Sequence, residues 1–149
     1  MDSQPAAVYP GSSARKNARA YNEVAFRHLL AADRRRAART TRSLFLVLIG
    51  IRRSPGRCAR LTNEAATIVF AGLSACVREI DLVGWYREGY VAAAVLPQAN
   101  EPSKTTAQLI TDRITRRLAS QLSERHARKL RVRVVRLGST FPTSIERFR

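Results

Sequence analysis

The feature that most limits the fold is an uninterrupted apolar run at positions 44–51, LFLVLIGI. A strand with one face in water alternates apolar and polar residues, whereas a strand covered on both faces is apolar throughout. The run is much shorter than the ~20 residues that a membrane-spanning helix needs. We therefore expect it to form the central strand of a sheet, buried on both faces.

Apolar spacing on either side of this run predicts three helices. The first covers residues 21–42, the second follows a loop at 52–60 that contains Pro55 and Gly56, and the third follows Pro97. Their apolar positions are, in order, Val24, Phe26, Leu29 and Leu30; Ala66, Val69, Phe70, Leu73 and Val77; and Ile110, Ile114, Leu118 and Leu122.

Three more strands complete the pattern. Residues 81–86 and 90–96 are joined by Arg87-Glu88-Gly89, a connection of hairpin length, and residues 130–137 form the last strand. The order predicts an α+β fold class: a ferredoxin-like or palm-type βαββαβ antiparallel sheet with an extra N-terminal helix, and with the helices on one face. We expect this four-stranded sheet to carry a core of Val69, Phe70, Leu73, Ile114 and Leu118.

The length fits one domain. Residues 1–17 are rich in small residues without periodicity, so we assign them to a disordered leader or linker and residues 18–149 to the domain. Phe141-Pro142 is expected to end the regular structure. The N-terminus lacks the charged and then apolar order of a signal peptide, and Cys58 and Cys76 form no disulfide framework, so we expect a cytoplasmic location.

Charge is the strongest compositional feature. The 27 Lys and Arg against 11 Asp and Glu give a net charge of +16, which attracts polyanions, nucleotides and anionic lipids. Nearly all of this charge is arginine, whose fork of donors suits phosphate. The codon bias of a GC-rich genome would give the same excess, so the charge indicates a class of ligand and not its identity.

Common catalytic and phosphate-binding motifs are absent. His28 and His126 have no nucleophile or acid at motif spacing, and no glycine-rich phosphate loop occurs. Trp85 and Tyr86 precede Arg87 and could stack on a base, but alternate residues of a strand face opposite sides. We expect Trp85 to belong to the core.

Two segments carry a more specific signal: residues 25–51, AFRHLLAADRRRAARTTRSLFLVLIGI, and residues 78–97, REIDLVGWYREGYVAAAVLP. The first resembles the opening helix and first strand of the GGDEF family of diguanylate cyclase domains. The second resembles the same family from its RxxD motif, through its signature hairpin, to the Leu-Pro that ends the next strand. The resemblance covers about residues 21–142 and implies the palm-type fold.

The resemblance also implies two divalent metals held by carboxylates, which this chain lacks at the matching positions. The first strand ends in Gly50-Ile51-Arg52, and the signature turn is replaced by Arg87-Glu88-Gly89-Tyr90-Val91, in which only Glu88 is acidic. Arginine at a metal position opposes a cation. We therefore expect no metal, no cofactor and no cyclase activity, with Arg87 and Glu88 as accessory residues at a degenerate turn.

Arg78-Glu79-Ile80-Asp81 reproduces the RxxD motif. In the GGDEF family this Arg and Asp bind cyclic di-GMP, so the resemblance implies a ligand site at Arg78 and Asp81. Guanidinium groups reach phosphate or guanine acceptors, and carboxylates accept from guanine amines. The alternative is structural: Arg78 stabilises the end of a helix and Asp81 caps the turn that follows.

Three functions remain open at this point. The first is an inactive GGDEF-like module that senses a cyclic dinucleotide or another nucleotide for a partner or fused effector domain; the resemblance links such modules to exopolysaccharide synthesis and sugar transferases. The second is a ligand-free interaction or dimerisation module. The third is a basic nucleic-acid-binding domain, although RNA-binding signatures with aromatic residues are absent.

Overall fold

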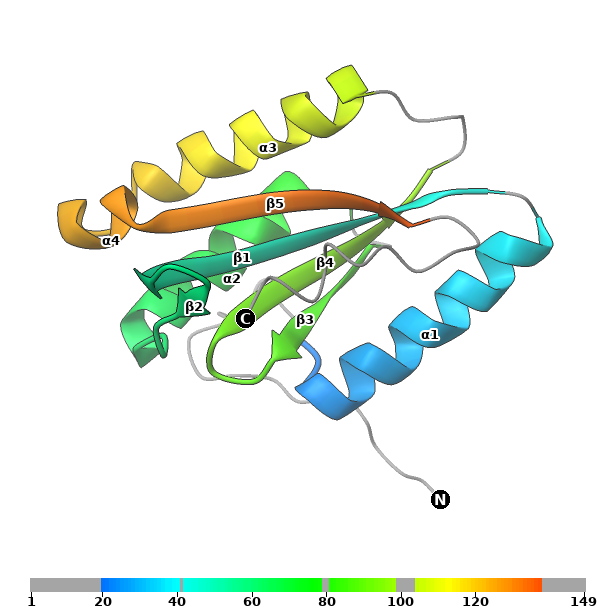
Figure 1. Cartoon of the computed structure of the whole chain (residues 1–149), viewed down its shortest axis with the longest axis horizontal. Coiled ribbons are helices and arrows are strands. Elements are labelled where there is room, and N and C mark those ends of the chain that lie inside the picture. The colour runs from blue at the N-terminus through cyan, green and yellow to red at the C-terminus, as the bar shows by residue number, and fades with distance from the viewer. Residues whose placement is uncertain (1–19, 41, 79–80, 99–103, 138–149) are drawn as a thin grey trace.

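The computed structural model describes residues 20–40, 42–78, 81–98 and 104–137. The expected leader at 1–17 and the terminator Phe141-Pro142 lie outside these residues. The elements are α1 (Glu23–Arg39), β1 (Leu44–Ser54), β2 (Arg57–Cys58), α2 (Asn63–Cys76), β3 (Leu82–Arg87), β4 (Val91–Pro97), α3 (Lys104–Ala119), α4 (Glu124–Arg128) and β5 (Leu130–Leu137) (Figure 1). No helix in this part of the chain is long and apolar enough to cross a bilayer.

The sheet is antiparallel and has β1 at its centre, as predicted. The main strands lie in the order β5-β1-β4-β3, and the short β2 pairs with the end of β1. Leu46 of β1 lies opposite Val95 of β4 on one side and Val135 of β5 on the other. The apolar run is therefore paired along both edges and covered on both faces.

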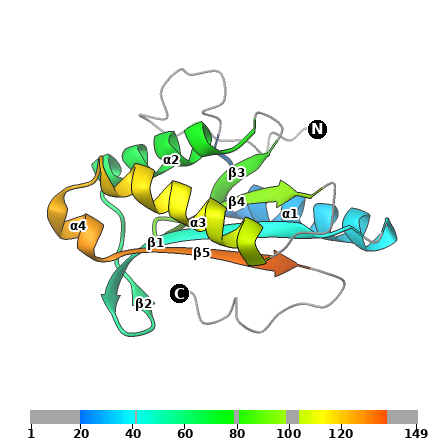
Figure 2. The same cartoon turned by 90° about the horizontal axis from the view of Figure 1, so that it is seen from above.

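The two faces of β1 carry separate cores. Phe45, Val47 and Ile49 pack with α2 and α3, whereas Leu46 and Leu48 pack with Phe26 and Leu30 of α1 on the other face. Figure 2 shows α3 and α1 on opposite sides of the sheet. The prediction that the helices share one face is correct for α2 and α3 and wrong for α1.

The predicted core is confirmed: Val69, Phe70, Leu73, Ile114 and Leu118 are buried. Burial of side chains of this size stabilises the fold by roughly 1.5–3 kcal/mol each. Val24 was expected to be apolar core but is 81% exposed, because α1 turns Ala25, Phe26, Leu30 and Ala37 toward the sheet instead.

Side-chain oxygens cap the N-termini of α1, α2 and α4. Asn22 accepts a hydrogen bond from the Ala25 amide (2.8 Å), Thr62 from the Ala65 amide (3.1 Å) and Ser123 from the His126 amide (3.2 Å). Each satisfies a backbone donor that the first turn of a helix leaves unpaired.

The stretch at 52–60, expected to be a loop, contains two short strand segments. β1 continues to Ser54, turns at Pro55-Gly56 and returns as β2, with Gly56 at φ 77°. The predicted hairpin is confirmed as β3 and β4. Gly89 in its turn has a left-handed conformation, with φ 82°.

The outer edge of β3 receives one more backbone segment. The Tyr21 amide donates to the Val83 carbonyl (3.0 Å), and the Trp85 amide donates to the Tyr21 carbonyl (2.9 Å). A Cβ at Gly84 would lie 2.6 Å from the Tyr21 carbonyl oxygen, so glycine is required for this approach.

Candidate functional site at Arg78 and Asp81

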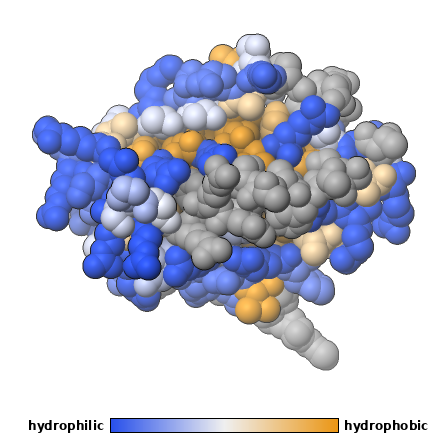
Figure 3. Space-filling model, in the orientation of Figure 1, coloured by the Kyte–Doolittle hydropathy of each residue, from blue (hydrophilic) through white to orange (hydrophobic). Residues whose placement is uncertain are grey.

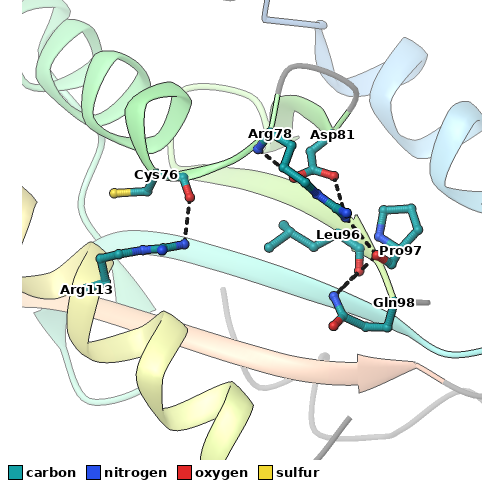
Figure 4. Close-up of polar contacts among 7 residues, drawn as sticks. All are labelled: Cys76, Arg78, Asp81, Leu96, Pro97, Gln98 and Arg113. Atoms are coloured by element: carbon teal, nitrogen blue, oxygen red, sulfur yellow. Dashed lines mark hydrogen bonds and ion pairs between the residues drawn. The ribbon is translucent and has the colours of Figure 1, made fainter. Parts of the chain in front are cut away.

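Arg78 and Asp81 close the turn between α2 and β3 and bind each other (Figure 4). The Asp81 carboxylate accepts from the Arg78 amide (2.8 Å) and from Arg78 Nε (3.4 Å) through Oδ2, and from Arg78 Nη2 (3.1 Å) through Oδ1. The Asp81 amide donates back to the Arg78 carbonyl (3.0 Å). The first and last residues of the sequence motif are thus bonded to each other.

The two side chains differ sharply in exposure. The Asp81 side chain is 1% exposed, whereas that of Arg78 is 58% exposed. Arg78 Nη2 also donates to the Pro97 carbonyl at the end of β4 (2.8 Å). The buried Asp81 carboxylate therefore orients the guanidinium. Of the two side chains, only that of Arg78 exposes a large part of its surface to a ligand.

A hollow of about 310 Å³ lies beside Arg78. It is bounded by the end of α1, the start of β1 and the end of β4. The residues that line the hollow are Asp33, Arg36, Ala37, Thr40, Arg42, Ser43, Leu44, Arg78, Pro97 and Gln98. The pairing of Leu44 with Pro97 brings these segments together. Arg36, Arg42 and Arg78 thus place three guanidinium groups around one concave surface.

One carboxylate belongs to the same hollow. Asp33 accepts from Arg36 Nη1 at 2.8 Å, and its side chain is 22% exposed. Guanidinium groups bind phosphate oxygens, often with two parallel bonds, and a carboxylate accepts from amino or imino groups of a base. The hollow has donors for an anionic ligand and an acceptor beside them.

Sequence reasoning missed Arg36, Arg42 and Gln98 as neighbours of Arg78. Arg36 belongs to a run of arginines that is more often a solvated face than a site. The available signal was topological: antiparallel pairing of β1 with β4 places the residues before Leu44 beside those after Leu96.

The turn at Arg87 and Glu88 lies at the opposite end of β3 from Arg78, so the structure does not bring these two residues into this hollow. Glu88 Oε1 accepts from the Glu23 amide at the start of α1 (3.0 Å), and the Glu88 amide donates to Glu23 Oε1 (2.7 Å). The Arg87 guanidinium carbon lies 4.4 Å from the centroid of the Tyr90 ring. The Glu88 carboxylate therefore binds the N-terminus of α1.

The positions of the implied metal ligands do not fit a cation. Gly50 is buried and offers no side-chain donor, and Arg52 is an exposed cation. In the part of the chain that the structure describes, no group of three or more His, Cys, Asp and Glu side chains could hold a metal ion.

The remaining sequence candidates are placed as follows. Trp85 is buried, as predicted, with its ring edge against Phe70 at a centroid distance of 4.9 Å. His28 and His126 lie on α1 and α4. Burial raises the pKa of the Cys58 thiol, with an opposing effect of Arg131 and Arg87, and burial likewise raises the pKa of Cys76, opposed by Arg113 and Arg117.

No protein-family model and no curated protein matches the sequence. The fold resembles solved structures of GGDEF-type proteins. A DGC protein from Thermotoga maritima is 20% identical, with 82% of this chain and 83% of that chain covered and a TM-score of 0.60. The FimX GGDEF domain from Pseudomonas aeruginosa is 17% identical, with 91% and 85% covered and a TM-score of 0.55.

Proposed function

From this GGDEF-like fold, we propose that the domain is a catalytically inactive regulatory module that binds cyclic di-GMP or another nucleotide through Arg78. One observation carries the proposal: an exposed guanidinium is fixed by a buried carboxylate at the rim of a hollow that holds two further arginines. A preorganised cation loses little rotamer freedom when it binds an anion.

The residues of the RxxD motif have different roles in this proposal. Arg78 contacts a phosphate or the acceptor edge of guanine, and Asp81 positions Arg78, because its own oxygens are directed at that residue. Arg36 and Arg42 supply further donors from across the hollow, and Asp33 is the carboxylate that could accept from a base.

Catalytic inactivity is part of the same proposal. Two-metal chemistry needs carboxylates that neutralise the triphosphate and activate the attacking hydroxyl. Gly50 and Arg52 offer none at the end of the apolar segment of β1, and Glu88 is bonded to the start of α1. We infer a domain that reports nucleotide binding to a partner or a fused effector domain in the cytoplasm, as a monomer or a homodimer. The proposed setting is control of exopolysaccharide synthesis or of a sugar transferase.

Binding of cyclic di-GMP to the Arg78→Ala variant tests the site. Loss of a charge-assisted contact of ~1.5–3 kcal/mol weakens binding roughly 10–100-fold. The matched control is Arg116→Ala, which removes the same charge from an exposed position on α3. Calorimetry at low and moderate salt should show a large loss only for Arg78→Ala, and equal losses that fade together with salt would reject a specific site.

A ligand-free interaction module is the second candidate, favoured by the burial of Asp81. In that case the Arg78–Asp81 pair serves only to fix the turn, and calorimetry of the unaltered protein against GTP, cyclic di-GMP and related dinucleotides would give no heat of binding. Saturable binding of any of them supports the sensor.

A further inference from the structure

A second basic hollow lies at the opposite end of β1 from Arg78. It measures about 380 Å³ and is lined by Arg52, the Pro55-Gly56 turn, Arg128, Lys129, Leu130 and Arg131. These residues come from β1, the β1–β2 turn, α4 and β5 (Figure 1). Figure 3 shows hydrophilic residues gathered over the end that carries α4 and β2.

Backbone pairing fixes the positions of these cations. The Arg52 amide donates to the Lys129 carbonyl at 2.8 Å, and Arg131 lies opposite Gly50 in the β1–β5 ladder. Residues two apart on a strand share a face, so Arg52 and Arg131 are diagonal neighbours on one face of the sheet. Gly50 adds no side chain between them.

Among the described residues, the cations of this hollow differ in their acidic neighbours. Glu124 accepts from Arg128 Nη2 at 2.8 Å, in a pair whose side chains are both largely exposed. Across the described residues, no carboxylate lies within ion-pair distance of Arg52 or Lys129. Arg53, Arg57 and Arg125 are also exposed and belong to β1, β2 and α4, the elements nearest the hollow.

We propose that this hollow binds an oligophosphate group directly, without a metal ion. Several guanidinium groups and one ammonium group converge on it, and guanidinium groups donate bidentately to phosphate oxygens. Arg52 lies just after the apolar segment of β1, so its side chain adds positive charge to the hollow at this end of the central strand. The site is separate from Arg78 and does not rest on the proposed sensor function.

The shape and chemistry of the hollow favour a compact phosphate ligand over a membrane or a nucleic acid. The exposed large apolar side chains of the described residues, Val24 and Leu109, lie on α1 and α3 and not at this end. Membrane-surface binding normally adds buried apolar area to charge. Among the described residues, no aromatic side chain lines the hollow to stack on bases, as single-stranded nucleic acid binding requires.

Titration with inorganic tripolyphosphate in the presence of EDTA tests the proposal. The site variant Arg52→Gln/Arg131→Gln is compared with Arg35→Gln/Arg116→Gln, which removes the same charge from exposed positions on α1 and α3. We expect at least about tenfold weaker binding for the site variant and less than about threefold for the control. Equal losses, no binding by the unaltered protein, or a requirement for Mg²⁺ would overturn the site.

Three further measurements identify the source of the phosphate and protect against misfolding. Phosphatidylglycerol vesicles and duplex RNA are offered in competition with tripolyphosphate; if either binds through Arg52 and Arg131 and tripolyphosphate fails to displace it, the compact site is wrong. Lys129→Met, at the exposed cap of α4, should also weaken binding while the circular dichroism spectrum is unchanged. In the Arg78→Ala variant, the tripolyphosphate binding that Arg52→Gln/Arg131→Gln removes should persist, which separates this site from the proposed dinucleotide site.

Discussion

At the scale of single residues, the contrast between Asp81 and Arg78 governs the candidate site. Asp81 is nearly inaccessible and accepts three hydrogen bonds from Arg78, while Arg78 also bonds the end of β4. The carboxylate therefore links the turn after α2 to the sheet, and its loss should disturb the structure before it disturbs ligand contacts.

The Asp81→Ala variant should lower the free energy of unfolding by about 1–3 kcal/mol, because it leaves the Arg78 amide and guanidinium without this buried acceptor. Glu124→Ala is the control, since the exposed Glu124–Arg128 pair is worth about 0.5 kcal/mol or less. Urea denaturation followed by Trp85 fluorescence measures both. Similar small changes in the two variants would show that the buried carboxylate contributes no more than a surface one.

The thiols give a second prediction at this scale. Burial raises the pKa of Cys58 and of Cys76, so the folded protein holds the thiol protons more tightly than the unfolded chain. Near neutral pH the thiols are protonated in both states, so they should cause no pH dependence of the free energy of unfolding. This free energy should fall as the pH rises above the ordinary thiol pKa. At pH 8 a thiol reagent should modify the native protein more slowly than the urea-unfolded protein; equal rates would contradict the effect of burial.

At the scale of elements, the docking of α1 and Tyr21 completes the sheet. The backbone amides of Glu23 and Glu88 each donate to the other residue's carboxylate, which joins α1 to the β3–β4 turn. Arg27 donates to the Tyr86 carbonyl at 2.9 Å. Tyr21 bonds the edge of β3 at Gly84. The N-terminal segment thus fastens both the edge and the turn of the hairpin.

The Gly84→Ala variant should detach Tyr21, since its Cβ would lie 2.6 Å from a backbone oxygen. We expect a loss of ~1–3 kcal/mol in the free energy of unfolding and faster hydrogen exchange of the Trp85 amide, which donates to Tyr21. In the Gly56→Ala control nothing lies within 4 Å of the added Cβ. Its cost is local strain at a positive φ, and unchanged Trp85 exchange in both variants would refute this account of Gly84.

Sequence patterns predict the elements that are long and periodic. The continuous apolar run gives β1 its central place because only a strand covered on both faces can be apolar throughout. The pattern could not reveal β2 or α4, since elements of two and five residues hold no periodicity. It also could not place α1 on the second face or join Glu23 to Glu88, because contacts across 65 positions are set by tertiary packing.

The candidate site was predictable only in part. Arg78 and Asp81 follow from a short motif, but the difference in their exposure does not, because burial depends on how the turn meets β4. Arg36 and Arg42 enter the hollow through the pairing of β1 with β4. A run of arginines in a sequence contains no information about which of its members lies beside a distant turn.

At the scale of the whole molecule, two hollows near opposite ends of β1 are each lined by several basic side chains. The general field of a chain with a net charge of +16 attracts every anion and is screened within about 10 Å at 0.1 M salt. Local geometry must therefore provide any selectivity, and two variants of equal charge differ only in that geometry.

Incubation of the protein with GTP and Mg²⁺ or Mn²⁺ should yield no cyclic di-GMP. The positions that would need carboxylates are Gly50, Arg52 and the turn at Arg87, and a cation there opposes metal binding. Chromatography of the nucleotide products provides the measurement. Product above background that disappears in Glu88→Ala would show that Glu88 serves a metal site.

The bond between Tyr21 and β3 also bears on aggregation. An open sheet edge presents unpaired amides and carbonyls that can recruit a strand from another chain. Tyr21 occupies one such border of the sheet at Gly84, and the strand at the opposite border, β5, carries Arg131, Arg133 and Arg136. Charged side chains on an edge strand repel an identical neighbour. One border thus pairs with the chain's own backbone at Tyr21, and the other carries charges that repel an identical strand. Both features disfavour continuous stacking of sheets, although the central strand is as apolar as an amyloid core.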